Sequence, residues 1–365
     1  MADSPYPELK KTHTMARVGR PWTDVKPAPS APVWNVIFGL GAYWMLVGAI
    51  EIGLFDALWD RGPLGPDELA NDLESSASHV ESLADALVVL GLLDRHDGRF
   101  DLNDCSRRYL CGQSPAPMAD LVSVAPGPEE NWTDLAATIR RGEPAKPVDA
   151  DVAGFWVPLV EGTFGTVLRA ATRADAWISY SHLEAPRVAD LGAGGAPWSI
   201  AVLRACPGAT AVVNDLPEVL EVARARLAEA GVEDRCELRP GDYHTVALED
   251  EAFDLVALGH VCRTEGADGT RALLGRAAAA LRPGGRVLVS DYFRAEDPSR
   301  SPQGVFMAAT MAACTVRGTA FSYDEMSSWL RDSGLSEVRL IEPIAAQQIF
   351  VATKPASTQG RKEER

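Results

Sequence analysis

The second part of the chain alternates short apolar segments with longer amphipathic ones, and this constrains its fold most. Strands are predicted over Arg187–Leu191, Ala209–Asn214, Arg235–Pro240, Phe253–Leu258, Gly285–Asp291, Glu337–Ile341 and Ala346–Lys354. Helices are predicted over Pro197–Ala205, Pro217–Ala230, Thr270–Leu281 and Tyr323–Ser333. Short apolar strands separated by helices indicate a mostly parallel sheet that is covered on both faces. The last two strands can form a hairpin, so the pattern predicts a seven-stranded α/β domain of Rossmann-like type.

The residues before this domain follow a mainly helical pattern. Two helices, Pro66–Leu73 and Val80–Leu93, precede a hairpin over Leu93–Leu102, whose tight turn is Asp97-Gly98. Helix, helix and hairpin in this order are typical of a winged helix. We therefore expect a mobile arm over 1–31, a helical winged-helix-type domain over 32–183, the α/β domain over 184–356 and a tail over 357–365.

A winged helix raises the possibility of DNA binding, and the charges argue against it. The helix that would enter the groove carries Glu81 and Asp85 and no Lys or Arg, whereas base and phosphate contacts need basic side chains. The whole chain has a net charge of −16, which repels nucleic acid. We interpret the winged helix as a structural module that builds a homodimer.

One apolar segment, Val36–Ile50, carries no charged residue and is followed at once by Glu51. It is shorter than the about 20 residues that a membrane-spanning helix needs. We expect a helix buried in a subunit interface and no membrane anchor. The six cysteines are scattered and the polar start lacks a signal region, so we expect a cytoplasmic protein without disulfides.

Polar and glycine-rich segments follow four successive predicted strands. The first is Asp190-Leu191-Gly192-Ala193-Gly194-Gly195, in which glycines allow a tight turn and a close approach to a ligand. Asp215 ends the next strand, before Leu216, and its carboxylate can accept both hydroxyls of a ribose. It can instead cap the helix that starts at Pro217. Because ligands bind at the carboxyl ends of parallel strands, we expect these residues to lie together.

The third and fourth segments complete this edge. Gly241-Asp242-Tyr243 follows the third strand, where an acid can receive an adenine amino group and an aromatic ring can pack on the base. Gly259-His260 follows the fourth strand, where a substrate would lie. The loop lacks the GxGxxG spacing that binds a pyrophosphate, since Pro197 stands at the third glycine position. A nucleotide-like ligand without phosphates, S-adenosylmethionine (SAM), therefore suits the loop better than NAD.

With these motifs the sequence resembles the bacterial class I SAM-dependent O-methyltransferases of secondary metabolism. The resemblance covers residues 32–355 and rests on the glycine loop, Asn214–Pro217, Gly241–Tyr243 and Leu281–Gly285. It implies a winged-helix dimerisation domain, a Rossmann-like domain, SAM as cofactor with S-adenosylhomocysteine (SAH) as product, and a small-molecule substrate such as an antibiotic precursor. The resemblance also implies SAM contacts for Asp190, Gly192, Gly194, Asp215, Leu216, Gly241, Asp242, Tyr243 and Gly259.

The segment after the fourth strand departs from the family pattern, because Arg263 stands where the family has its catalytic His. Arginine stays protonated and cannot serve as a general base. Three routes remain open: His260 or His244 acts as base, Glu265 acts as base, or the nucleophile is already activated and Arg263 holds its anion. We favour C-, N- or O-methylation of an already activated nucleophile. The alternative is a SAM-binding enzyme that catalyses a non-methylating reaction such as cyclisation or hydroxylation.

Three further side chains are candidates for the substrate pocket. Trp156 precedes the α/β domain, and Met307 and Met311 lie on the helix that follows the fifth strand. Large apolar residues at helical spacing also fit an ordinary core. A metal site of His244, His260 and Asp242 is compatible with the residue types, but nothing in their spacing demands it, so we expect no metal.

Overall fold

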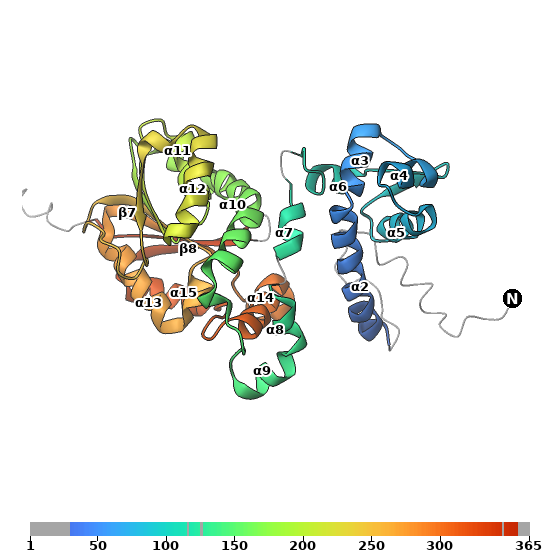
Figure 1. The fold of residues 1–365 in the computed structure, drawn as a ribbon. Helices are drawn as coiled ribbons and strands as arrows, with labels where there is room; N and C mark the ends of the chain where they lie inside the picture. Colours follow the sequence, from blue (N-terminus) through green and yellow to red (C-terminus); the bar gives the residue numbers. More distant parts are fainter. Residues whose placement is uncertain (1–29, 115–116, 125–126, 345–346, 357–365) are drawn as a thin grey trace, which may run out of the picture. The chain divides into compact units, whose positions relative to one another are not determined.

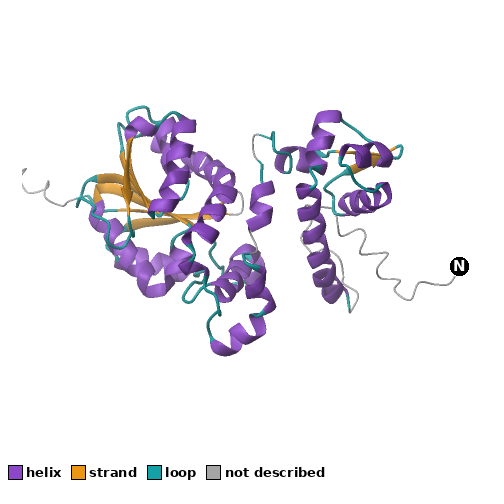
Figure 2. Cartoon of the chain, viewed as in Figure 1, coloured by secondary structure: helices purple, strands orange, loops and turns teal. Residues whose placement is uncertain are grey.

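The computed structural model describes residues 30–114, 117–124, 127–344 and 347–356. The tail over 357–365 and all but the last two residues of the expected arm over 1–31 lie outside the described residues. Contacts divide the chain into two compact units, Met1–Ser123 and Val124–Arg365. Figures 1 and 2 show a helical unit and a unit built on a sheet.

The N-terminal unit contains the expected winged helix. Its elements are α2 (Ala31–Glu51), α3 (Leu54–Arg61), α4 (Pro66–Asp72), α5 (Ala77–Val89), β1 (Asp94–His96), β2 (Arg99–Asp101), α6 (Asp104–Tyr109) and α7 (Ala119–Val124). Asp97 and Gly98 both have positive φ, +49° and +77°, as a two-residue hairpin turn requires. Arg95 of the hairpin pairs with Glu81 and Asp85 of α5, so these acids brace the wing against the helix.

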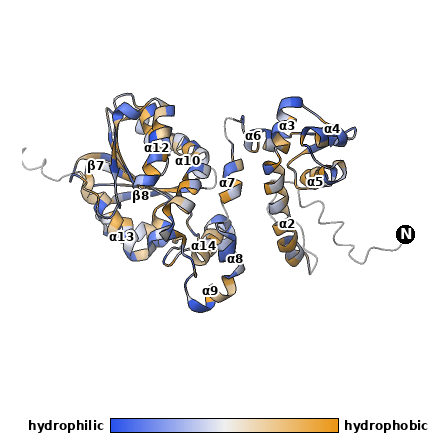
Figure 3. Ribbon diagram, viewed as in Figure 1, coloured by the Kyte–Doolittle hydropathy of each residue, from blue (hydrophilic) through white to orange (hydrophobic). Residues whose placement is uncertain are grey.

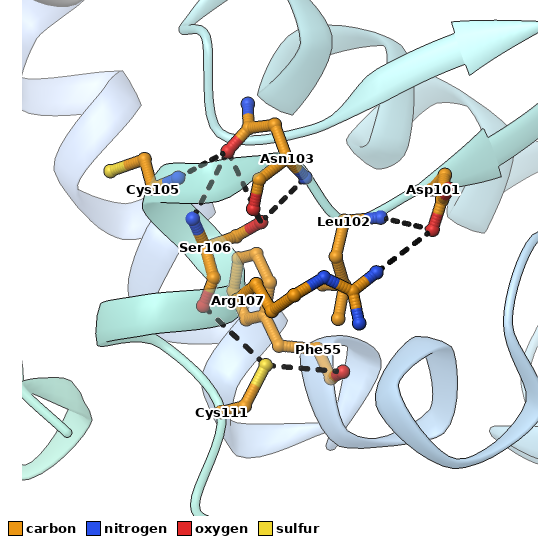
Figure 4. A network of polar contacts seen from close by, with 8 residues as sticks. All are labelled: Phe55, Asp101, Leu102, Asn103, Cys105, Ser106, Arg107 and Cys111. Atoms are coloured by element: carbon orange, nitrogen blue, oxygen red, sulfur yellow. Dashed lines mark hydrogen bonds and ion pairs between the residues drawn. The ribbon is translucent and has the colours of Figure 1, made fainter. Parts of the chain in front are cut away.

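A capping network starts α6 directly after the hairpin (Figure 4). The Asn103 side chain accepts hydrogen bonds from the backbone N–H groups of Cys105 and Ser106, both at 3.0 Å. The Ser106 hydroxyl accepts one from the backbone N–H of Asn103 at 3.1 Å. This reciprocal arrangement satisfies amide groups that the first helical turn leaves unpaired.

Helix α2 is rich in apolar residues (Figure 3), yet few of them are buried in the single chain. Only Ala31, Val47 and Ala49 are buried. Its exposed large residues include Val36, Ile37, Phe38, Leu40 and Trp44. By length and composition alone the helix also meets the criteria for a membrane span. A helix that exposes this many apolar side chains needs a partner surface to shield them from water.

The C-terminal unit carries the sheet. It begins with α8 (Glu129–Thr133), α9 (Leu135–Arg141), η1 (Val148–Ala150), the π-helical turn η2 (Val152–Trp156), α10 (Val157–Ile178) and η3 (Tyr180–His182). The strands are β3 (Arg187–Leu191), β4 (Thr210–Asp215), β5 (Cys236–Pro240), β6 (Phe253–Gly259), β7 (Leu281–Asp291), β8 (Ser336–Ile344) and β9 (Gln347–Thr353). The remaining helices are α11 (Pro197–Ala205), α12 (Pro217–Ala230), η4 (Glu233–Arg235), α13 (Cys262–Ala280), η5 (Pro298–Arg300), α14 (Pro302–Cys314) and α15 (Tyr323–Asp332).

The strand order is β5-β4-β3-β6-β7-β9-β8, with all pairs parallel except those that β9 makes with β7 and β8. This confirms the predicted seven-stranded, mostly parallel sheet with a closing hairpin. Adjacent residues on β3 face opposite sides: Val188 packs in one core cluster with α10, α11 and α12, and Ala189 packs in the other with α13 and α15. The sheet is therefore covered by helices on both faces.

Helix α10 explains why the division by contacts differs from the expected boundary at 183/184. Ala170, Ala171 and Ala174 of α10 are fully buried in the same cluster as α11 and β3. The small side chains let the helix lie close against the sheet unit. Its apolar face thus belongs to the α/β core, although it precedes the first strand.

Candidate cofactor and active site

The loop after β3 has the backbone shape that its glycines predict. Gly192 and Gly194 have φ of +62° and +57°, in the left-handed region that favours glycine. A Cβ at Gly192 would lie 2.7 Å from the Val261 side chain, and one at Gly195 would lie 2.8 Å from the Phe164 ring. The loop is thus a closely packed backbone surface at the carboxyl end of the central strand.

Asp190 lies beneath this loop and not at its surface. Its carboxylate is fully buried and accepts hydrogen bonds from the backbone N–H and the hydroxyl of Ser199 at 3.1 and 2.7 Å. Ser199 lies in the first turn of α11, where amide groups lack helical partners. Burial raises the pKa of Asp190 to about 7. The structure therefore gives Asp190 the position of a group that holds α11 to β3, and a direct SAM contact remains a prediction.

Asp215 closes β4 and faces the glycine loop. Its carboxylate accepts hydrogen bonds from the backbone N–H of Gly194 and of Leu216, each at 2.7 Å. Helix α12 has Leu216 as N-cap residue and no side-chain cap bond, so the alternative of Asp215 as a helix cap does not hold. Burial raises the pKa of Asp215, and the Gly194 hydrogen bond opposes the shift. A ligand hydroxyl at this carboxylate would join a group already fixed in place.

Asn214, the residue before Asp215, ties three segments of the edge together. Its side-chain NH₂ donates to the backbone carbonyls of Arg239 and Gly241, both at 2.8 Å. Its backbone carbonyl accepts a hydrogen bond from the Ala193 N–H at 2.9 Å. Asn214 belongs to the Asn214–Pro217 motif, but the sequence pattern predicted no site role for it. Its signal was a buried amide at the end of an apolar strand, where a polar group needs partners.

The loop after β5 joins the start of α13. Exposed Asp242 accepts a hydrogen bond from the backbone N–H of His244 at 2.7 Å. The Tyr243 hydroxyl donates to Glu265 Oε1, and His244 Nε2 lies 2.6 Å from Glu265 Oε2. Burial, followed by the bond to Glu265, raises the pKa of Tyr243. Three residues that the sequence selected separately thus form one cluster.

Gly259 and His260 end β6 in a crowded position. A Cβ at Gly259 would lie 2.8 Å from the Trp198 indole, so the glycine makes room for this bulky residue in the first turn of α11. His260 has φ of +63°, which is strained for a residue with a side chain. Its Nδ1 lies 3.6 Å from Asp291 Oδ1, and its ring lies 5.4 Å from that of Tyr292.

Arg263 shares this carboxylate with His260. Its Nη1 lies 3.3 Å from Asp291 Oδ1, and its backbone N–H donates to Asp291 Oδ2 at 3.1 Å. Burial alone would raise the pKa of Asp291, but the charges of Arg263 and His260 hold it below the usual value. Asp291 was missed in the sequence because its partners lie far back in the chain. The available signal was an acid at the end of the buried strand β7.

The three substrate-pocket candidates belong to one region of the C-terminal unit. Trp156 packs on a small apolar cluster that includes Ala313 and Cys314 of α14. Met311 is buried on the same helix, and Met307 is half-buried one turn earlier. Their contact with a substrate remains a prediction. Within the described ranges, no three His, Cys, Asp or Glu side chains group as metal ligands.

The edge as a whole fits an adenosyl ligand with a cationic sulfur. Gly192 and Gly194 give the loop its left-handed turn, Asp215 offers a carboxylate beside Gly194, and Asp242 and Tyr243 offer an acid and a ring at the next strand. These groups follow β3, β4 and β5, on one side of the loop. His260, Arg263 and Asp291 follow β6 and β7, on the other side. The adenosine half would therefore lie toward β4 and β5, and the methyl group toward β6 and β7.

Comparisons with known proteins agree with this geometry. Residues 34–112 match the model of the O-methyltransferase dimerisation domain, and residues 171–336 match that of the O-methyltransferase domain. The chain is 30% identical over 318 residues to 3-hydroxy-5-methyl-1-naphthoate 3-O-methyltransferase of Streptomyces sahachiroi, covering 83% of this chain and 88% of that protein. It is 25% identical over 323 residues to the N,N-dimethyltransferase OxyT of Streptomyces rimosus, covering 85% and 92%.

The fold also matches that of a methyltransferase solved with SAM bound. Human N-acetylserotonin methyltransferase in complex with SAM superposes with a TM-score of 0.77 at 21% identity, over 92% of this chain and 100% of that one. The matched dimerisation domain contains the exposed helix α2, which supports a homodimer. The chain therefore belongs to the O-methyltransferase family, and it is a SAM-dependent methyltransferase related to enzymes of secondary metabolism.

Proposed function

We propose that this enzyme methylates a small secondary metabolite whose nucleophilic atom is already activated when it meets the cofactor. The observation that carries the proposal is Arg263, a permanent cation that is paired with buried Asp291 on the methyl side of the edge. A phenolate, an enolate or a neutral amine needs no base from the protein at the moment of transfer. The relatives act on oxygen and on nitrogen, which is compatible with this range of substrates.

The residues around Arg263 suit a nucleophile that carries negative charge. A guanidinium has five N–H donors. Nη1 is shared with Asp291, and Nε is buried without a partner among the described residues. Remaining donors can hold the anion of the substrate, while SAM supplies the electrophilic methyl group. Trp156, Met307 and Met311 would then cover the apolar part of the substrate.

Relatives that are methyltransferases favour methyl transfer over the alternative of a non-methylating reaction. The same relatives favour a small-molecule substrate and a cytoplasmic location over a membrane. The net charge of −16 argues against nucleic acid as a partner. The test is a panel of acceptors incubated with methyl-labelled SAM: enolisable diketones, acidic phenols, unactivated phenols and amines. We expect label in acceptors that carry an available lone pair or anion at the assay pH. Label confined to unactivated phenols, which require a base, would overturn the proposal.

A further inference from the structure

Glu265 stands at a junction of three segments. It is followed by Gly266, whose φ of +67° and ψ of 179° interrupt α13 and leave Cys262–Glu265 as a separate turn. The carbonyl of Arg317 would lie 3.2 Å from a Cβ at Gly266. The backbone N–H of Thr319 donates to the Arg263 carbonyl at 2.7 Å. The segment that follows α14 thus holds the Cys262–Glu265 turn on one side.

On its other side the same turn is held by the β5 loop. One carboxylate oxygen of Glu265 accepts the Tyr243 hydroxyl, and the other lies 2.6 Å from His244 Nε2. A Cβ at Gly192 would lie 3.4 Å from the Tyr243 ring, so the ring rests against the glycine loop. Glu265 therefore ties the end of β5 to the start of α13 beside the loop that follows β3.

The cluster leaves Glu265 without a free carboxylate oxygen to accept a proton from a substrate. Its side chains are mostly buried, with exposures of 15% for Glu265 and 27% for His244. Both carboxylate oxygens already have partners. Its two loop residues follow Asp242 and β5, on the side where Asp215 and Asp242 would hold adenosine, and not on the β7 side where Asp291 lies.

We propose that Glu265 is a positioning residue for the adenosine half of SAM, clamping Tyr243 and His244 into a fixed wall against the glycine loop. The inference rests on the proposed function for the placement of SAM and gives Glu265 a role in cofactor binding in place of proton transfer. A satisfied buried polar network gives one rigid arrangement, and removal of its central carboxylate leaves buried donors without partners. The wall should then loosen, and affinity for any adenosine-containing ligand should fall.

The test is calorimetric binding of SAH and of 5′-methylthioadenosine, which lacks the amino-acid part, to the full chain. We expect Glu265→Ala to lower the affinity for both ligands by the same factor, about tenfold. This is the order of the effect when buried donors lose their partner. Glu265→Gln should restore most of the affinity, because its amide oxygen accepts from Tyr243 and its NH₂ donates to His244 Nε2. The matched control is Asp268→Asn, a fully exposed acid on the same helix, which should leave both affinities unchanged.

Two results would overturn the clamp: unchanged affinity in Glu265→Ala, or a loss for SAH with none for 5′-methylthioadenosine. If Glu265→Ala loses its fold by circular dichroism, Tyr243→Phe replaces it, since this change removes one hydroxyl only. We expect a severalfold loss for both ligands, and wild-type affinity would contradict the proposal. These are binding measurements, so wild-type enzyme that binds SAH but labels no acceptor would refute the proposed function alone.

Discussion

At the scale of single residues, the buried carboxylate of Asp291 holds His260 and Arg263 together on the methyl side of the site. Arg263→Met would leave it without its strongest counter-charge, and breaking a buried pair in this way costs about 3 kcal/mol or more. We expect urea unfolding to show a loss of this size. The matched control Arg224→Met removes an exposed pair with Glu221 and should cost less than about 1 kcal/mol. Equal losses in the two variants would show that the Asp291 pair is not special.

Asp190 predicts a pH dependence of stability. Its pKa in the folded protein, about 7, lies above that of an unfolded chain, so the folded state holds the proton more tightly. The stabilisation is complete below the unfolded pKa, near pH 4, and is lost as the pH rises through 7, by at most about 1.4 kcal/mol per pH unit. Asp190→Asn should flatten this decline in the free energy of unfolding. Identical slopes for variant and wild type would contradict the assignment.

At the scale of elements, Gly259 tests how tightly β6 and α11 meet. Gly259→Ala would place a methyl group 2.8 Å from the Trp198 indole, so the tryptophan must shift and the glycine loop with it. We expect a loss of about 1–3 kcal/mol in stability and weaker SAH binding. Gly275→Ala, which meets open space within α13, should be neutral or stabilising. A stable Gly259→Ala variant with normal SAH affinity would be inconsistent with this packing.

The elements also show what the sequence could and could not predict. Strand β3 and helices α11 and α12 were predicted to the residue, because glycine and proline mark their ends. The start of α13 was expected at Thr270 but lies at Cys262, because the break at Gly266 disguised the first turn as loop. Asp291 and the Tyr243–His244–Glu265 cluster depend on contacts between distant strand ends, and no local pattern reports such pairing.

At the scale of the molecule, exposed α2 predicts the oligomeric state. Leu40→Glu with Trp44→Glu places two charges on a helix that the dimerisation domain includes. Burying unpaired charges in an interface is costly, so we expect the dimer to dissociate to monomers in light scattering coupled to size exclusion. Ser328→Glu, an exposed position on α15, is the control and should leave the mass unchanged. A double variant that remains fully dimeric would place the interface elsewhere.

The proposed chemistry of this enzyme is methyl transfer from SAM at the edge formed by β3 to β7. The most direct measurement incubates the wild-type chain with methyl-labelled SAM and an extract of small molecules from its source organism. We expect label in a small molecule and one SAH formed for each methyl group transferred. Tight SAM binding with neither labelled product nor SAH, in the presence of the true substrate, would contradict it.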